Sequence, residues 1–278
     1  MRETPQEGSS LQYRSGDAQL FYTEQGAGAP LILLHPTPLH HGFWLPVAAL
    51  LAARYRVVMP DLRGHGQSEA GDGPITIEKL GADIERLLDE LRIERAIFAG
   101  CSIGGYTLYE LWRRCPRRVR ALAFCSSKPQ ADTEQNRATR QANMEKIRQR
   151  GSGEFIEAML ASLIGSSTRS RWPQKTAEAR EMMQAMRPEA IIAVQQGLAS
   201  RPDSVETAKT IQVPCCVVAA GEDGGSTPAD MRLLAEAIRS GGAQVEYHEI
   251  PDAGHYAPWE QPETAGPILR RFFDGVRP

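Results

Sequence analysis

The chain has 278 residues, a length that suits one large domain or a core with an inserted lobe. Hydrophobic residues make up 41% and charged residues 24% of it, an ordinary balance that excludes collagen-like, coiled-coil and wholly disordered classes. The formal net charge of -2 supplies no overall positive field, so we expect neither a nucleic-acid partner nor an anionic membrane surface.

The first elements along the chain predict a sheet edge. Residues 1–10 are polar and lack the apolar stretch of a signal peptide. Runs 11–13 and 20–23 then flank Ser15-Gly16-Asp17, the pattern of an antiparallel hairpin. Six further segments are candidates for buried strands: 31–34, 56–59, 96–99, 121–124, 215–219 and 245–250.

Helical patterns alternate with these strands. They cover residues 43–53, 77–91, 103–114 and 263–273. In 77–91 the apolar residues recur at helical spacing while the acidic residues face away. Strands that alternate with helices predict the α/β class, with an eight-stranded, mostly parallel sheet flanked by helices.

The alternation stops between residues 130 and 209. No strand-like run interrupts this charged stretch, which predicts helices at 133–150, 154–163, 177–186 and 188–199. A helical insertion between two strands is most simply a lid over the carboxyl ends of the strands. We therefore expect a core of residues 1–129 and 210–278 and a helical cap of residues 130–209.

The five cysteines form no recognisable framework. They stand at positions 101, 115, 125, 215 and 216, an odd number whose spacing matches no zinc pattern. Most lie in apolar strand-like runs, and no apolar run approaches the roughly 20 residues that span a bilayer. We expect a reduced, cytoplasmic protein without disulfides, bound metal or membrane segment.

The sharpest chemical signal is the segment AIFAGCSIGG at residues 96–105, an apolar strand that runs through G-x-S-x-G into a predicted helix. A tight strand-to-helix turn would raise the Ser102 hydroxyl clear of the sheet, and Gly100, Gly104 and Gly105 provide the room for it. The alternative, a serine that only caps the helix, does not require glycine on both sides.

A nucleophilic serine needs a base, and His255 is the best placed of the six histidines. It follows the last predicted strand, at the same sheet edge as Ser102. His35 also follows a strand but precedes Pro36. The others we interpret as structural or surface residues: His40, His41, His65 and His248.

A carboxylate must orient this base, and the loop after strand 215–219 offers two. We favour Asp223 over Glu222 as the acid. Asp132 is a further alternative, although the pattern Ala131-Asp132-Thr133-Glu134 favours a helix cap for it.

Four segments together resemble a known family. They are LLHPTP at residues 33–38, PDLRGHGQS at 60–68, the serine turn, and AGH at 253–255 followed by WEQP at 259–262. They resemble the α/β-hydrolase fold superfamily, and within it small serine esterases and lactonases with a helical lid. The resemblance implies Ser102 as nucleophile, His255 as general base, and the backbone N–H groups of Thr37 and Ile103 as the oxyanion hole. It implies a small ester or lactone as substrate and no cofactor, and it makes residues 61–68 a structural loop.

Two positions depart from the pattern of this family. Pro36 replaces a glycine and has no N–H, so it cannot donate to an oxyanion. Gly224 stands where relatives carry the acid, and Asp223 comes one residue early. Either a rearranged loop brings Asp223 or Glu222 to His255, or the acid comes from elsewhere, for example Asp132, or the histidine has no orienting carboxylate.

The substrate pocket should lie between the lid and the loop near Thr37. We expect His35, Trp44 and Tyr256 to line it, and further candidates are His40, Met144, Met159, Met182 and Met183. Other reactions stay open: a carbon–carbon or cyanohydrin lyase, a perhydrolase, or a catalytically impaired ligand-binding member of the family. A homo-oligomer is compatible with the sequence.

Overall fold

The computed structural model describes residues 11–276, so the polar segment 1–10 and the expectation drawn from it lie outside the described residues. Its centre is one eight-stranded sheet in the order β1-β2-β4-β3-β5-β6-β7-β8. β1 (Leu11–Ser15) and β2 (Ala18–Gln25) form the expected edge hairpin, and β2 also runs antiparallel to β4. The remaining strands are parallel: β3 (Ala29–Leu34), β4 (Tyr55–Pro60), β5 (Ala96–Cys101), β6 (Val119–Cys125), β7 (Cys215–Ala220) and β8 (Val245–Ile250). The predicted α/β fold class is confirmed.

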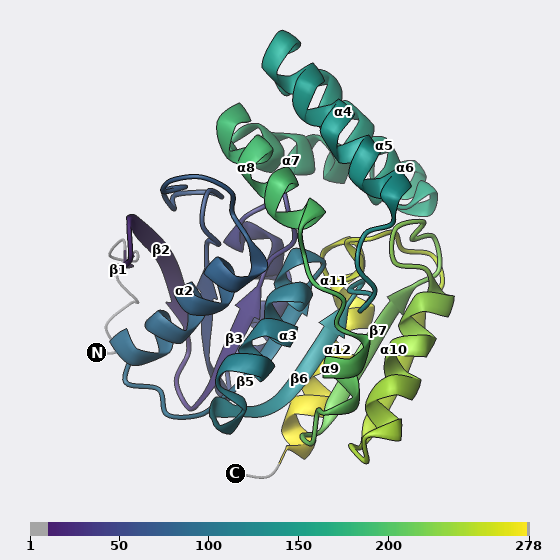
Figure 1. Cartoon of the computed structure of the whole chain (residues 1–278). Helices are drawn as coiled ribbons and strands as arrows, with labels where there is room; N and C mark the ends of the chain where they lie inside the picture. The colour runs from purple at the N-terminus through teal and green to yellow at the C-terminus, as the bar shows by residue number, and fades with distance from the viewer. Residues whose placement is uncertain (1–10, 277–278) are drawn as a thin grey trace, which may run out of the picture.

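Both faces of the sheet are covered, which explains why the inner strands β3 to β7 are mainly apolar. In β3, Ile32 and Leu34 join the core on one face, whereas Leu31 and Leu33 join the core on the other. The first core includes α2 (Ile77–Glu90), α3 (Ile103–Arg114) and α10 (Pro228–Ser240). The second includes α1 (Leu45–Leu51), α11 (Ala257–Glu260) and α12 (Pro262–Gly275). Figure 1 shows α2 and α3 in front of the sheet and α12 behind it.

Two short 3-10 turns complete the core of the fold, η1 (His41–Trp44) before α1 and η2 (Pro116–Arg118) before β6. Within residues 11–276, no helix combines the length and the apolar character that a membrane crossing requires. The five cysteines are free, and four of them are buried in or beside the sheet.

Six helices separate β6 from β7 along the chain. They are α4 (Glu134–Arg150), α5 (Gly153–Leu163), α6 (Ser166–Arg171), α7 (Pro173–Gln184), α8 (Pro188–Ala199) and α9 (Val205–Lys209). α4 packs on α8 and α5 packs on α7, and Figure 1 shows this group above the ends of the strands. α9 packs instead against α3 and α10, so the chain is back on the core before the predicted boundary at residue 209.

An arginine of the 60–68 loop holds the edge hairpin to the rest of the sheet. Arg63 Nε and Nη2 donate to both carboxylate oxygens of Asp83 in α2, at 2.9 and 2.7 Å. Its guanidinium also binds Asp17 and the carbonyl of Ser15 in the hairpin. The Arg63 and Asp83 side chains are 4% and 3% exposed, so the pair is shielded from water. The loop is structural, as the sequence predicts.

We predict that Arg63→Ala lowers the free energy of unfolding by about 3–5 kcal/mol, because it leaves the Asp83 carboxylate buried without its partner. Arg86 pairs with Glu90 on the exposed face of the same helix, and Arg86→Ala should cost less than about 0.5 kcal/mol. Urea unfolding of both variants checks the difference. Equal stability losses would contradict a structural role for the buried pair.

Candidate active site

Ser102 stands on a strained turn between β5 and α3. Its φ is 53° and its ψ is -117°, a backbone conformation that a residue with a side chain adopts only under constraint. The turn allows no side chain on the adjacent glycines. A Cβ on Gly100 would collide with the backbone of Gly104, and a Cβ on Gly104 would collide with the Leu34 carbonyl. The glycines are therefore a steric requirement of the serine turn.

His255 and Asp223 meet at the carboxyl ends of β8 and β7. His255 Nδ1 lies 2.8 Å from Asp223 Oδ2, and the two residues are 5% and 4% exposed. Because the carboxylate accepts the Nδ1 proton, Nε2 carries none and is free to accept one. Burial alone would raise the pKa of Asp223, but the His255 ring and the N–H groups of Ser226 and Gly225 outweigh it, so that pKa is lowered. The residue pair that the sequence favours is in hydrogen-bond contact.

The shifted position of the acid has a local explanation. The Asp223 N–H donates to the Ala220 carbonyl, and the Asp223 carboxylate accepts the N–H groups of the two residues that follow Gly224. A Cβ on Gly224 would meet no atom within 4 Å. The loop therefore turns residue 223 toward the histidine and residue 224 toward open space.

The two other carboxylates considered as the acid have different partners. Glu222 accepts the Ser167 N–H and the hydroxyls of Ser166 and Ser167, and so binds the start of α6. Asp132 binds two arginines, and Thr133 rather than Asp132 caps α4. The interpretation of Asp132 as a helix cap is wrong, because its side chain turns inward to charges that the local sequence does not reveal.

The loop that carries His255 is held by a second buried carboxylate. Glu260 is 1% exposed and accepts the N–H groups of Gly254, Tyr256 and Gly165, at 2.9, 3.0 and 2.9 Å. The His255 N–H donates to the Leu163 carbonyl at 2.8 Å. A Cβ on Gly254 would collide with the backbone of Gly165, so this close approach of the two loops requires glycine. The connection between α5 and α6 thus supports the histidine directly.

Two buried histidines position the Thr37 loop. His35 Nε2 accepts the Leu62 N–H, so its Nδ1 is protonated and donates to the Pro36 carbonyl. His65 Nδ1 donates to the Arg63 carbonyl, which leaves Nε2 to accept the Thr37 hydroxyl at 2.9 Å. Desolvation by burial lowers the pKa of both rings, for His65 to about 4, and favours the neutral forms that these bonds require.

The two expected oxyanion donors are both unengaged. Thr37 lines the same cavity as Ser102, and Ile103 is the first residue of α3, where an N–H has no partner within the helix. In the described part of the chain, neither the Thr37 N–H nor the Ile103 N–H donates a hydrogen bond. Pro36 supplies no N–H, and its carbonyl accepts the Leu39 N–H to form the turn that presents Thr37.

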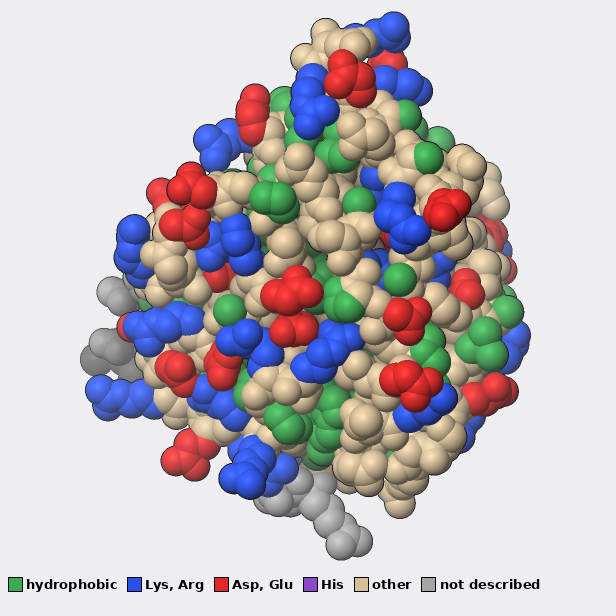
Figure 2. All heavy atoms as spheres, viewed as in Figure 1, with side chains coloured by type: hydrophobic (Ala, Val, Ile, Leu, Met, Phe, Trp, Pro, Cys, Tyr) green, Lys and Arg blue, Asp and Glu red, His purple; other side chains and the backbone are tan. Residues whose placement is uncertain are grey.

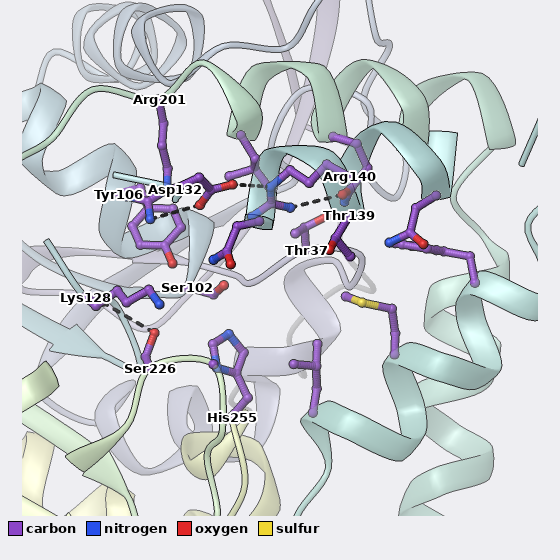
Figure 3. A pocket seen from close by; sticks show the side chains of 18 residues that line it. Thr37, Ser102, Tyr106, Lys128, Asp132, Thr139, Arg140, Arg201, Ser226 and His255 are labelled. Atoms are coloured by element: carbon purple, nitrogen blue, oxygen red, sulfur yellow. Dashed lines mark hydrogen bonds and ion pairs between the residues drawn. The ribbon is translucent and has the colours of Figure 1, made fainter. Parts of the chain in front are cut away.

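A cavity of about 270 Å³ brings the serine and the histidine together (Figure 3). Ser102, His255 and Thr37 line its floor, and Figure 3 shows the first two side chains facing each other. Residues from the helical segment form the opposite walls. They include Asn136, Thr139, Arg140, Asn143, Phe155, Met159, Leu163, Gln195, Leu198 and Arg201.

The expected lining by His35, Trp44 and Tyr256 is wrong for this cavity. All three side chains are completely buried and do not line it. Trp44 packs edge-on to Phe43 in the core behind the sheet, and Tyr256 lies under the loop and donates its hydroxyl to the Thr37 carbonyl. Of the methionine candidates only Met159 lines the cavity, whereas Met182 and His40 line a separate surface groove.

The polar wall of the cavity does not follow from the sequence pattern. Tyr106, Lys128, Arg140, Gln195 and Arg201 received no functional interpretation, although all line it. Lys128 had a detectable signal, since it follows β6 at the same sheet edge as the other site residues. The two arginines lie in helices far apart along the chain, and no local pattern relates them.

One cluster has the composition of a metal site. Ligand atoms of His40, His41 and Asp61 lie within 4.8 Å of one another. Hydrogen bonds occupy several of them, because His40 Nδ1 accepts the Gly42 N–H and Asp61 accepts the N–H groups of His41 and Gln67. The cluster connects loops 35–44 and 60–68, and we assign no metal to it.

The chain is similar to proteins of a known family. Residues 31–265 match the model of the alpha/beta hydrolase family. A 3-oxoadipate enol-lactonase of Acinetobacter baylyi is 30% identical over 246 residues, 85% of each chain. An esterase of Thermogutta terrifontis superposes with a TM-score of 0.91 at 29% identity, over 98% of this chain and 100% of that one. The enol-lactonase of Burkholderia xenovorans gives 0.87 at 28% identity, over 95% and 100%.

The chain belongs to the alpha/beta hydrolase family, since the family model covers most of its length. Its relatives include lactonases and esterases, and it is a hydrolase of this family.

The environment of Asp61 predicts how the stability of the protein depends on pH. Burial alone would raise the pKa of Asp61, but the hydrogen bond to His41 and other contacts outweigh it and lower that pKa from 3.8 to about 2. A lowered folded-state pKa adds stability that is present above the unfolded value and is lost as the pH falls through the folded value. Because the pKa is lowered from 3.8 to about 2, this contribution is about 2 kcal/mol at neutral pH.

We therefore predict that Asp61→Asn is less stable than the wild type at pH 6, and that the gap shrinks by about 1 kcal/mol at pH 3, where part of the wild-type advantage is gone. Urea unfolding at the two pH values measures this. A gap that stays constant or widens in acid would show that Asp61 has no lowered pKa.

Proposed function

We propose that the protein is a serine hydrolase that cleaves a small carboxylic ester or lactone through an acyl-enzyme on Ser102. The observation that carries the proposal is the buried 2.8 Å contact between His255 Nδ1 and Asp223 Oδ2, beside a serine raised on a strained turn in the same cavity. Nucleophile, orienting acid and base occur in the chain order Ser, Asp, His that is usual on this architecture.

In this mechanism each residue has one task. His255 Nε2 takes the proton of the Ser102 hydroxyl while the serine oxygen attacks the carbonyl carbon of the substrate. Asp223 holds the ring in the tautomer that accepts this proton and stabilises the imidazolium that forms. His255 then returns the proton to the leaving alcohol, and a water molecule repeats the sequence to release the acid.

The N–H groups of Thr37 and Ile103 would donate hydrogen bonds to the negatively charged oxygen of the tetrahedral intermediate. Preorganised donors of this kind are worth on the order of 10²–10³ in rate for each group. The bonds to His65 and Tyr256 fix the Thr37 loop before substrate arrives, so the donor needs no reorganisation. The start of α3 adds the positive end of the helix dipole at the same point.

Ester or lactone chemistry agrees with the names of the relatives. The curated relatives include an enol-lactonase and, at 28% identity over 242 residues, a pimeloyl-[acyl-carrier protein] methyl ester esterase of Chromobacterium violaceum. In our proposal residues 130–209 act as the lid, because side chains of α4, α5 and α8 line the cavity that holds Ser102. The substrate reaches the serine beneath them.

We predict that Ser102→Ala lowers kcat/KM for a short-chain ester on the order of 10⁴-fold, and that Asp223→Asn does so about 10³–10⁴-fold because the ring loses its tautomer. Glu222→Gln is the matched control, since this neighbouring carboxylate contacts α6 and not the histidine. Steady-state hydrolysis measures all three. Full activity of Ser102→Ala would reject the proposed nucleophile, and a larger loss in Glu222→Gln than in Asp223→Asn would reject the proposed acid.

The position of the acid allows a second test. We predict that the double variant Asp223→Ala/Gly224→Asp is as inactive as Asp223→Ala, although it restores the acid where relatives carry it. The reason is that a side chain at position 224 points into open space. Hydrolysis of the same ester by the single and double variants is the measurement. Recovery to within tenfold of wild type would show that the loop accepts either register.

A further inference from the structure

The cavity differs from the molecular surface in its charge. Over the face shown in Figure 2, acidic and basic side chains are interspersed, as the formal net charge of -2 suggests. The cavity, in contrast, is lined by three cations, Lys128, Arg140 and Arg201, and by one carboxylate, Asp132. These residues have a formal charge of +2, or +1 when the Asp223 carboxylate behind His255 is included.

Asp132 cannot neutralise both arginines. Its Oδ2 binds Arg140 Nε at 2.5 Å and its Oδ1 binds Arg201 Nη2 at 3.2 Å. Arg201 is 5% exposed and stacks its guanidinium on the Tyr106 ring, 4.3 Å from the ring centre. Its Nε is buried and has no hydrogen-bond partner in the described structure. A buried N–H donor without a partner is costly, and a ligand or an ordered water molecule that accepts from it would relieve that cost.

Lys128 brings a third cation close to the nucleophile. It follows β6 by three residues, and Ser127 beside it donates to the carbonyl of Ser102. Figure 3 shows the Lys128 side chain directed toward Ser102. Its ammonium makes no ion pair or hydrogen bond with any residue of the described range 11–276. The serine therefore faces a cation that is free to bind an anion in the cavity.

The other wall of the cavity is apolar. Phe155, Met159 and Leu163 recur every four residues along α5 and present one face of that helix to the cavity. With a volume of about 270 Å³ the cavity holds only a small molecule. Its shape suits a short hydrocarbon chain on the α5 side and an anion on the side of Lys128 and Arg201.

We propose that the substrate is a short ester or lactone that itself carries a carboxylate, bound by Lys128 and Arg201 a few bonds from the scissile carbonyl. Arg201 offers planar donors that suit a carboxylate, and Lys128 offers a mobile ammonium that can follow it. This inference rests on the proposed esterase function and adds the substrate class.

The test compares two substrates of the same size: the monomethyl ester of glutaric acid, which carries a carboxylate, and its neutral monoamide analogue. We expect kcat/KM of the wild type to be at least about tenfold higher for the acid. Lys128→Gln should reduce this preference about tenfold, chiefly through KM, and Lys128→Arg should retain most of it. Lys146→Gln, an exposed lysine of α4 outside the cavity, is the matched control and should keep the wild-type preference.

Calorimetric binding of the same two esters to Ser102→Ala separates this inference from the proposed function. The carboxylate-bearing ester could bind to Ser102→Ala and lose this binding when Lys128→Gln is added, while the wild type turns over neither ester. That result would support the anion site and overturn the esterase. Two results would overturn the anion site and leave the proposed esterase intact. One is equal kcat/KM of the wild type for the two esters. The other is a preference for the charged ester that is unchanged in Lys128→Gln.

Discussion

The buried contact between Asp223 and His255 is the interaction on which the rest of the site depends. It joins the loops that follow β7 and β8, two neighbouring parallel strands whose carboxyl ends the sheet places side by side. The Gly225 and Ser226 N–H groups fix the carboxylate, and Glu260 fixes the backbone on both sides of the histidine. The ring therefore has one tautomer and one orientation before any substrate arrives, which is what the proposed proton transfer to and from Ser102 requires.

The helical segment between β6 and β7 lines the cavity and also contacts the loop that carries His255. The connection between α5 and α6 accepts the His255 N–H and donates to Glu260, so it is part of the support of the proposed base. Glu222 binds the start of α6 from the other side. The same segment carries Arg140, and Arg201 follows α8. A change in the segment that alters substrate choice would thus also act on the geometry of the proposed base.

Much of the architecture follows from local pattern. All eight strands lie where the sequence predicts them, and the inner strands β3 to β7 follow apolar runs because a parallel sheet covered on both faces needs apolar strands. The predictions fail at short or polar elements. Helices α6 and α9 have six and five residues, too few for a helical period, and neighbouring loops and helices hold them in place. The sequence pattern also begins the next helix at residue 177, whereas α7 begins at Pro173.

The sequence by itself determined the fold class, the serine turn and the candidate histidine, because each depends on residues that are adjacent or that end successive strands. Only the tertiary structure decided which carboxylate meets His255, since the turn of one loop directs residue 223 inward and residue 224 outward. It also decided the polarity of the cavity. Asp132 meets Arg140 and Arg201 from positions 8 and 69 residues away, and charges that pair over such separations leave no periodic signal in the chain.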